Sequence, residues 1–215
     1  MKLKIKIIIF LLYFAFSSFL YAEKISFSAS SMTAQSSGEN TSTKLIGDAF
    51  VRTSTIEVLA DVIEMHGENY RYIKARGNIS GKNLETNMEF SCDSLEYDRQ
   101  TKLAILQGDV NLKDIENNLT AKAQIIEYNQ ETEVAVLQIE VNIVQKENTC
   151  NGSYAVYKKN EQSLIISGNA QVKQKEDTFR AQQISLNLET QEISLMGNVS
   201  GTVTQEEKEG EDVSN

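Results

Sequence analysis

Few residues in this 215-residue chain have the type and spacing that catalysis requires. His66 is the only histidine, and it lies beside Gly67 in a predicted turn, so we interpret it as a surface residue rather than a general base. The sequence has no G-x-S-x-G, H-E-x-x-H or glycine-rich phosphate loop. Acidic residues fall mainly in predicted turns and at outward positions. We therefore expect no enzyme, no metal site and no cofactor.

The ends of the chain differ in composition from the rest. Three lysines, an apolar run and a small-residue cleavage pattern predict a secretory signal peptide at residues 1–22. A retained membrane anchor is the alternative, because the run is only slightly short of a spanning helix. Residues 205–215 are mostly acidic and have no hydrophobic pattern, which predicts a disordered tail.

The net charge argues against one class of partner. Residues 1–22 contain three basic and no acidic residues, so their removal changes the formal charge from −9 to −12. Nucleic-acid affinity depends on Lys and Arg that neutralise phosphates, and no basic patch interleaved with aromatic residues occurs. We expect no nucleic-acid partner.

One residue slot recurs every 29 to 31 residues in the middle of an alternating apolar segment. In "LAILQGDVNL" (103–112), for example, Gly108 interrupts a run that otherwise reads as a half-buried strand. The slot is occupied in turn by Gly47, Gly77, Gly108, Ile139, Gly168 and Gly197.

A second motif precedes the slot in each repeat. Copies such as "FSCDSLEY" (90–97) and "AKAQIIEY" (121–128) contain a small residue followed three positions later by an apolar one. A spacing of three breaks strict alternation, so we expect a bend or bulge there. Short polar clusters separate the two motifs. The pattern predicts one elongated all-β domain over residues 23–204, with about a dozen antiparallel strands joined by short turns.

The repeated motif resembles the OstA-like family of lipopolysaccharide-transport proteins, which includes LptA, LptC and the amino-terminal domain of LptD. The resemblance rests on the small residue, the apolar residue three positions later, the aromatic residue near the turn and A-x-L-x-G-x-V. It implies a V-shaped β-jellyroll, also called a β-taco, in the periplasm. It also implies an apolar trough that carries lipopolysaccharide or a similar amphiphile between the membranes.

Hydrocarbon chains need such a trough, because exposing about a dozen methylenes to water costs on the order of 10 kcal/mol. We expect alternate residues to line it and to contact lipid. Glycines at inward slots would leave the trough open, whereas the alternative is that they only permit the sheet to bend. The expected lining residues are Leu106, Val110, Ile126, Leu137, Ile166, Ile184, Gly77, Gly108, Gly168 and Gly197.

The two cysteines lie too far apart in the predicted repeat to form a disulfide. Cys92 and Cys150 are two repeats apart, and each repeat contributes two strands. At about 4.8 Å per strand the separation is nearly 20 Å, whereas a bridge spans about 7 Å. The sequence therefore predicts two free, largely buried thiols.

The ends of the sheet are the expected partner surfaces. Strands near residues 27–34 and 193–203 would have unpaired backbone groups, and the chain has no proline to protect them. The family resemblance implies that such edges join other Lpt-type jellyroll proteins, or copies of this chain, by strand addition. Two rival functions remain open: a membrane-anchored LptC-like component, and a structural or adhesive repeat protein without lipid cargo.

Overall fold

The structure is a computed structural model that describes residues 24–37 and 40–204. The predicted signal peptide (1–22) and acidic tail (205–215) lie outside the described residues. The described residues form fourteen strands and one short 3-10 helix, η1 (Glu68–Tyr70). The strands are β1 (Ser26–Ser28), β2 (Ser31–Ser37), β3 (Asn40–Arg52), β4 (Ile56–His66), β5 (Tyr72–Asn83), β6 (Met88–Asp98), β7 (Leu103–Asp114), β8 (Leu119–Asn129), β9 (Val134–Gln145), β10 (Asn148–Lys158), β11 (Ser163–Gln174), β12 (Asp177–Asn187), β13 (Ile193–Met196) and β14 (Ser200–Thr202).

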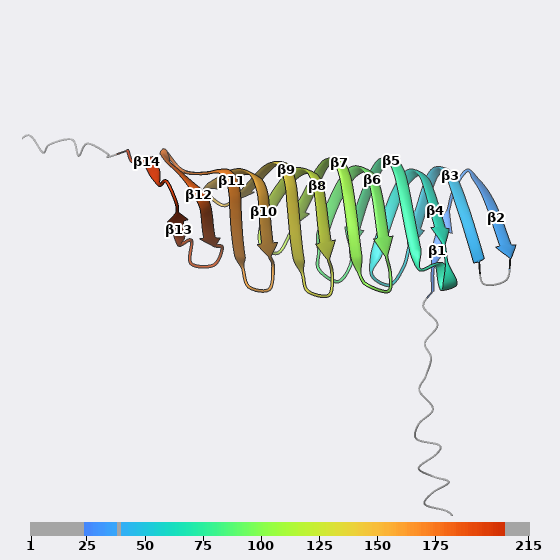
Figure 1. Cartoon of the computed structure of the whole chain (residues 1–215). Helices are drawn as coiled ribbons and strands as arrows, with labels where there is room; N and C mark the ends of the chain where they lie inside the picture. The colour runs from blue at the N-terminus through green and yellow to red at the C-terminus, as the bar shows by residue number, and fades with distance from the viewer. Residues whose placement is uncertain (1–23, 38–39, 205–215) are drawn as a thin grey trace, which may run out of the picture.

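All the strands belong to one antiparallel sheet, which confirms the predicted fold class. The order is β1-β3-β4 and then onward in chain order to β13, with β2 also paired to β3 and β14 also paired to β12. From β2 to β13, each strand therefore pairs with its neighbours in sequence, as short turns require. The result is an elongated array of similar hairpins (Figure 1).

A bulge interrupts each long strand pair at the repeated slot. Between β7 and β8, Gln107 pairs with Ile125 and Val110 with Ala123, so two residues on β7 oppose one on β8. Gly108 and the following Asp109 have left-handed φ values of 81° and 41°. Equivalent register shifts occur at the other slots. The bulges bend every long strand from β3 to β12 and fold the sheet over on itself.

The bent sheet forms two layers that face each other (Figure 1). We call the layer that ends in turns 67–71, 99–102, 130–133, 159–162 and 188–192 layer A. Layer B ends in turns 53–55, 84–87, 115–118, 146–147 and 175–176. The bulges join the layers along one side of the molecule. The two rows of turns meet along the opposite side, which we call the mouth.

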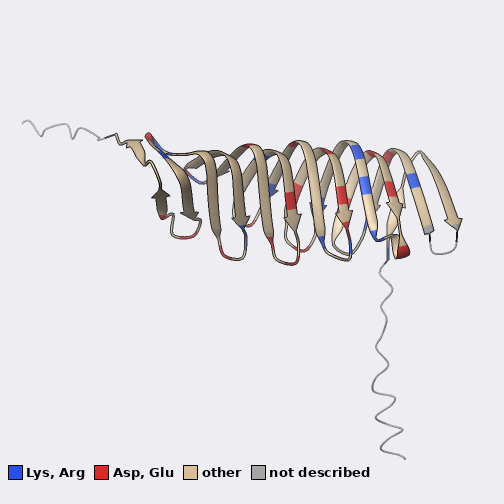
Figure 2. Cartoon of the chain, viewed as in Figure 1, with Lys and Arg blue, Asp and Glu red and all other residues tan. Residues whose placement is uncertain are grey.

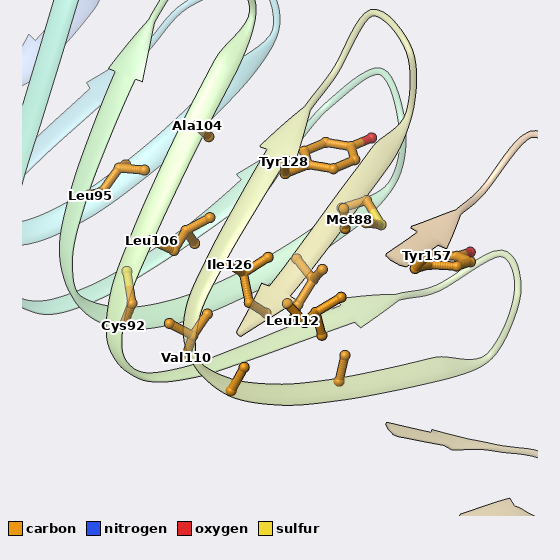
Figure 3. Packing of buried hydrophobic residues seen from close by; sticks show 14 of the residues in the cluster. Met88, Cys92, Leu95, Ala104, Leu106, Val110, Leu112, Ile126, Tyr128 and Tyr157 are labelled. Carbon is orange, nitrogen blue, oxygen red and sulfur yellow. The ribbon is translucent and has the colours of Figure 1, made fainter. Parts of the chain in front are cut away.

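The hydrophobic core lies between the layers. Leu95, Leu106 and Ile126 point inward from layer A, and Leu112 and Met88 point inward from layer B (Figure 3). All five side chains are at most 2% exposed. The period of two in the sequence therefore places one apolar face of each layer in a shared interior.

The glycine slots do not face this interior, which corrects the inward orientation expected for Gly77, Gly108, Gly168 and Gly197. A Cβ added to Gly108 would lie 2.8 Å from the Cβ of Asp93, an exposed residue on the outer side of the bend. Ile139, which fills the same slot, is 52% exposed. The left-handed backbone reverses the alternation locally, so the structure supports the alternative in which glycine permits the bend.

Ile139 is a β-branched residue at a left-handed φ of 66°, a conformation that glycine adopts more easily. We expect Ile139→Gly to raise the free energy of unfolding by about 0.5–1 kcal/mol, because relief of strain exceeds the entropy cost of glycine. Gly108→Ala, at φ 81°, should lower it by about 1 kcal/mol or more. Urea denaturation of the three proteins tests this, and destabilisation by both changes would contradict the bulge assignment.

Candidate functional site

The candidate site is the apolar interior between the layers. Six of the residues expected to contact lipid are at most 2% exposed: Leu106, Val110, Ile126, Leu137, Ile166 and Ile184. Their contact with lipid stays a prediction. Their neighbours Gln107, Asp109 and Asn169 are exposed, and Gln138 is half-buried. The structure thus brings the six apolar residues into one interior and leaves the four glycines at the bends.

The interior is packed rather than an open trough. A cavity of about 20 Å³ lies between Leu106 and Tyr128 of layer A and Met88 and Leu112 of layer B. This volume holds about one water molecule, whereas ligand pockets usually measure about 300–1,000 Å³. A hydrocarbon chain could occupy this interior only if the layers moved apart.

Polar side chains close the mouth by bonding across the two layers. We call this network the polar seam. It begins where Thr55 and Tyr97 share a hydrogen bond of 3.4 Å and continues where Gln130 donates to Glu85. Near its other end, Asn148 Nδ2 donates to Gln191 Oε1 over 2.8 Å. The seam residues are Thr55, Glu85, Thr86, Asp114, Glu116, Asn117, Gln145 and Asn148 of layer B, and Tyr97, Gln130, Tyr157, Lys159, Gln162 and Gln191 of layer A.

A buried ion pair forms the centre of the polar seam. Asp114 is 0% exposed, and its Oδ1 accepts from Lys159 Nζ over 3.0 Å. Its Oδ2 accepts from Tyr157 Oη over 2.6 Å and from Asn117 Nδ2 over 2.9 Å. Lys159 also donates to the Thr86 carbonyl oxygen over 2.8 Å. Two strands, β7 and β10, and two turns, 115–118 and 159–162, are therefore joined across the layers at one carboxylate (Tyr157 is labelled in Figure 3).

The charges of this pair are mutually stabilised. Burial alone would raise the pKa of Asp114, but hydrogen bonds from Tyr157, Asn117 and Lys159 outweigh burial and hold it below the ordinary value of 3.8. Burial opposes the charge of Lys159 as well, yet bonds to Glu116 and Asp114 raise its pKa. The pair is therefore ionised at neutral pH.

The turns within each layer are connected differently from the turns across the mouth. Backbone hydrogen bonds connect successive turns of one layer, as from Gln130 N–H to the Lys102 oxygen in layer A and from Leu84 N–H to the Thr55 oxygen in layer B. Every cross-layer bond at the mouth found among the described residues uses at least one side chain. Each layer is thus a backbone-bonded unit, and the seam is its weaker connection to the other layer.

Both thiols are free and buried, as predicted. Cys92 lies beside the bend on β6, and Cys150 lies on β10. Burial raises the pKa of each thiol to about 12. The side chains therefore act as small apolar residues of the interior.

Apolar side chains are exposed on and beside the short strands at the two ends of the sheet. β1 and β2 share one edge, where Phe27 and Met32 are 46% and 54% exposed. β13 and β14 share the other, where Met196 and Val199 are 63% and 55% exposed. These are the terminal strands that the sequence indicated as partner surfaces.

The outer faces of the described strands carry an aromatic pair and exposed ion pairs. His66 stacks on Tyr72 with ring centroids 5.2 Å apart. Charged residues alternate across the outer face of β3–β6, with Lys44–Glu64 at 2.7 Å (Figure 2). Within the described ranges no cluster of three or more His, Cys, Asp or Glu residues could hold a metal ion. In the same part of the chain, no helix is long and apolar enough to cross a membrane.

Sequence reasoning missed the polar seam. Asp114 resembles Asp98 and Asn129, which also end a strand and accept backbone N–H bonds that start a turn. Nothing in the local pattern indicates that Asp114 alone is fully buried. The tyrosines that end the second motif, Tyr97 and Tyr157, were visible as a repeated feature, and their hydroxyl groups are the signal that could have indicated polar contacts at the mouth.

Comparisons with known proteins agree with this architecture. A family model described as "LptA/(LptD N-terminal domain) LPS transport protein" matches residues 89–192. The crystal structure of LptH from Pseudomonas aeruginosa, the LptA-homologous periplasmic component of its lipopolysaccharide transport device, matches with a TM-score of 0.53 and 16% identity. The alignment covers 56% of this chain and 97% of LptH. No curated protein sequence matches the chain.

The buried position of Asp114 predicts a strong and pH-dependent contribution to stability. We expect Asp114→Asn to lower the free energy of unfolding at neutral pH by about 3 kcal/mol, because Lys159 then lacks its buried partner. A lowered folded-state pKa means that the stabilisation is present above the unfolded value of 3.8 and is lost as pH falls through the folded value. The difference between wild type and variant should therefore shrink under acidic conditions.

Asp109→Asn is the matched control, because Asp109 is exposed and asparagine occupies the same place at Asn78, Asn169 and Asn198. It should change stability by less than about 0.5 kcal/mol. Urea unfolding over a pH series measures both variants. Equal effects of the two substitutions, or a difference that grows in acid, would contradict the described role of Asp114.

Proposed function

The family match over residues 89–192 and the shared fold assign this chain to the OstA-like/LptA family, and from that premise we propose that it is a periplasmic carrier of lipopolysaccharide or a similar amphiphile. The carrier binds acyl chains between layers A and B and passes them along the axis of the sheet toward the outer membrane. It performs no catalysis and uses no cofactor.

The continuous apolar interior is the observation that carries the proposal. From Leu45 on β3 to Leu186 on β12, buried apolar residues extend through ten consecutive strands. At about 4.8 Å between strands, the interior runs for roughly 40 Å, and its direction is perpendicular to the strands. Acyl chains placed there would exchange contact with water for contact with side chains, which stabilises them by about 0.8 kcal/mol per methylene.

The sheet edges supply a route between proteins. β2 at one end and β13 with β14 at the other have only one paired side each. A second jellyroll protein, or another copy of this chain, could extend the sheet there and continue the interior. We propose these edges as the contacts with inner-membrane and outer-membrane partners.

One observation favours a second function. The interior is packed in this structure, as a structural or adhesive repeat protein without cargo would require. A membrane-anchored LptC-like role depends instead on residues 1–22, which lie outside the described residues. Intact mass of the protein isolated from its native envelope separates the anchored form from the processed form.

Photo-crosslinking with purified lipopolysaccharide tests the carrier function. We expect a photoreactive residue placed singly at Leu106, Val110, Ile126, Leu137, Ile166 or Ile184 to form lipid adducts. The same residue at Gln107, Asp109, Gln138 or Asn169 should form few, because these side chains face outward. Adducts are measured by mass shift after irradiation.

Circular dichroism of each substituted protein provides the folding control. Equal labelling of both sets, or labelling of neither set in folded protein, would remove the carrier function. The structural-protein alternative would then account for the packed interior.

The edge contacts have their own test in self-association. Val199→Lys places a charge on the exposed edge beside β14 and should weaken association of the chain with itself about tenfold. Val144→Lys is the matched control, because Val144 is 40% exposed on the central strand β9 and Val199 is 55% exposed at the end. Sedimentation velocity measures the self-association of both variants. Equal association of the two variants would exclude this edge as the contact.

A further inference from the structure

The two sides of the molecule resist separation of the layers unequally. On the bend side, the backbone of every long strand passes continuously from one layer to the other through a bulge. On the mouth side, the cross-layer contacts among the described residues use side chains. The layers can therefore part at the mouth without breaking a backbone ladder, and they cannot part at the bend.

Opening the mouth in water alone is unfavourable for a specific reason. The polar seam can exchange its hydrogen bonds for bonds to water at modest net cost, since an intramolecular hydrogen bond contributes little beyond its hydrated alternative. The apolar interior has no such compensation, because opening would expose Leu106, Leu112 and Ile126 to water. Hydrocarbon that replaces the lost contacts removes this penalty. Acyl chains therefore favour the open form and water favours the closed form.

The closed seam is held most strongly at its centre. All contacts of Lys159 are short, with Glu116 Oε2 at 2.7 Å in addition to Thr86 and Asp114. Three other buried polar atoms, Thr86 Oγ1, Tyr128 Oη and Asn148 Oδ1, have no hydrogen-bond partner among the described residues. An unsatisfied buried acceptor weakens the closed state locally. The Asp114–Lys159–Tyr157 cluster is thus the strongest contact that opening must break.

The bend offers a place for the angle between the layers to change. Glycines with left-handed φ between 73° and 81° occupy five of the six repeated slots: Gly47, Gly77, Gly108, Gly168 and Gly197. Glycine adopts a wide range of dihedral angles at low cost. Small rotations at successive bulges would sum to a wider mouth while each layer keeps its own backbone bonds.

We propose that the polar seam is the lipid-loading site of this protein and that the Asp114–Lys159–Tyr157 cluster is its latch. Acyl chains of the amphiphile pass between the turns of the two layers after the latch breaks, and the seam closes again when the chains leave. This inference rests on the proposed carrier function, and it adds where the lipid enters and which contact limits its passage.

A reversible lock across the mouth is the test. In a Cys92→Ala/Cys150→Ala background, Asn117→Cys and Gln162→Cys place thiols on opposite layers, where the native side chains are 3.3 Å apart. Alanine is found at the matching positions Ala60 and Ala121 of other repeats. A short bifunctional methanethiosulfonate joins the pair, and reductant releases it. Lipopolysaccharide is the probe, and a photoreactive residue at Leu106 reports its arrival.

We expect the locked protein to form no lipid adduct and the reduced protein to regain it. A control lock between Gln100→Cys and Glu131→Cys joins two exposed turns of layer A and should leave adduct formation unchanged. Equal adducts in the locked and reduced mouth would overturn the loading site. Absence of adducts in the reduced and never-locked proteins would instead overturn the carrier function itself.

Breaking the latch should have the opposite effect. Lys159→Met is expected to raise the rate of adduct formation about tenfold, because the barrier no longer includes the ion pair. Lys158→Met is the matched control, since Lys158 contacts Glu161 on its own turn over 3.0 Å. Circular dichroism establishes that both variants fold. An unchanged rate in folded Lys159→Met would show that the cluster is not the latch.

Discussion

The bulge that recurs in every long strand pair is the constraint on which this structure depends. A flat antiparallel sheet with one apolar face would expose that face to water. Two left-handed residues in succession, such as Gly108 and Asp109, bend each strand so that its two halves face each other. Because all bulges lie along one line, the sheet covers its own apolar face. The apolar core, the mouth and the polar seam all follow from this alignment of the bulges.

The folded sheet leaves its two layers joined very differently on their two sides. Covalent backbone joins them at the bend, and polar side chains join them at the mouth. Buried ion pairs such as Asp114–Lys159 add little net stability compared with apolar packing, yet they are costly to leave half-broken. A seam of this kind favours either a fully closed or a fully open mouth. That property suits the proposed carrier function, which requires an interior that is dry when empty and accessible when lipid is present.

The repeat made most of the fold predictable from the sequence. Alternation around Leu106 and Leu137 indicated the strands and their inward faces, and the spacing of three after Cys92 and Ala123 indicated the bends. The same alternation predicted an inward-facing Gly108. That prediction is wrong, because two consecutive residues with left-handed φ reverse the alternation. The polar seam was not predictable, since it depends on which turns meet across the mouth. That contact joins residues such as Thr86 and Lys159, which are 73 positions apart.

The central claim is that the layers separate at the mouth when acyl chains occupy the interior, and a distance measurement tests it directly. Spin labels at the exposed Lys113 of layer B and Glu131 of layer A report the width of the mouth by pulsed electron paramagnetic resonance. Labels at Gln100 and Glu131 report on layer A alone. The account predicts that bound lipopolysaccharide lengthens the first distance and leaves the second unchanged. An unchanged first distance in protein that has demonstrably bound lipid would contradict it.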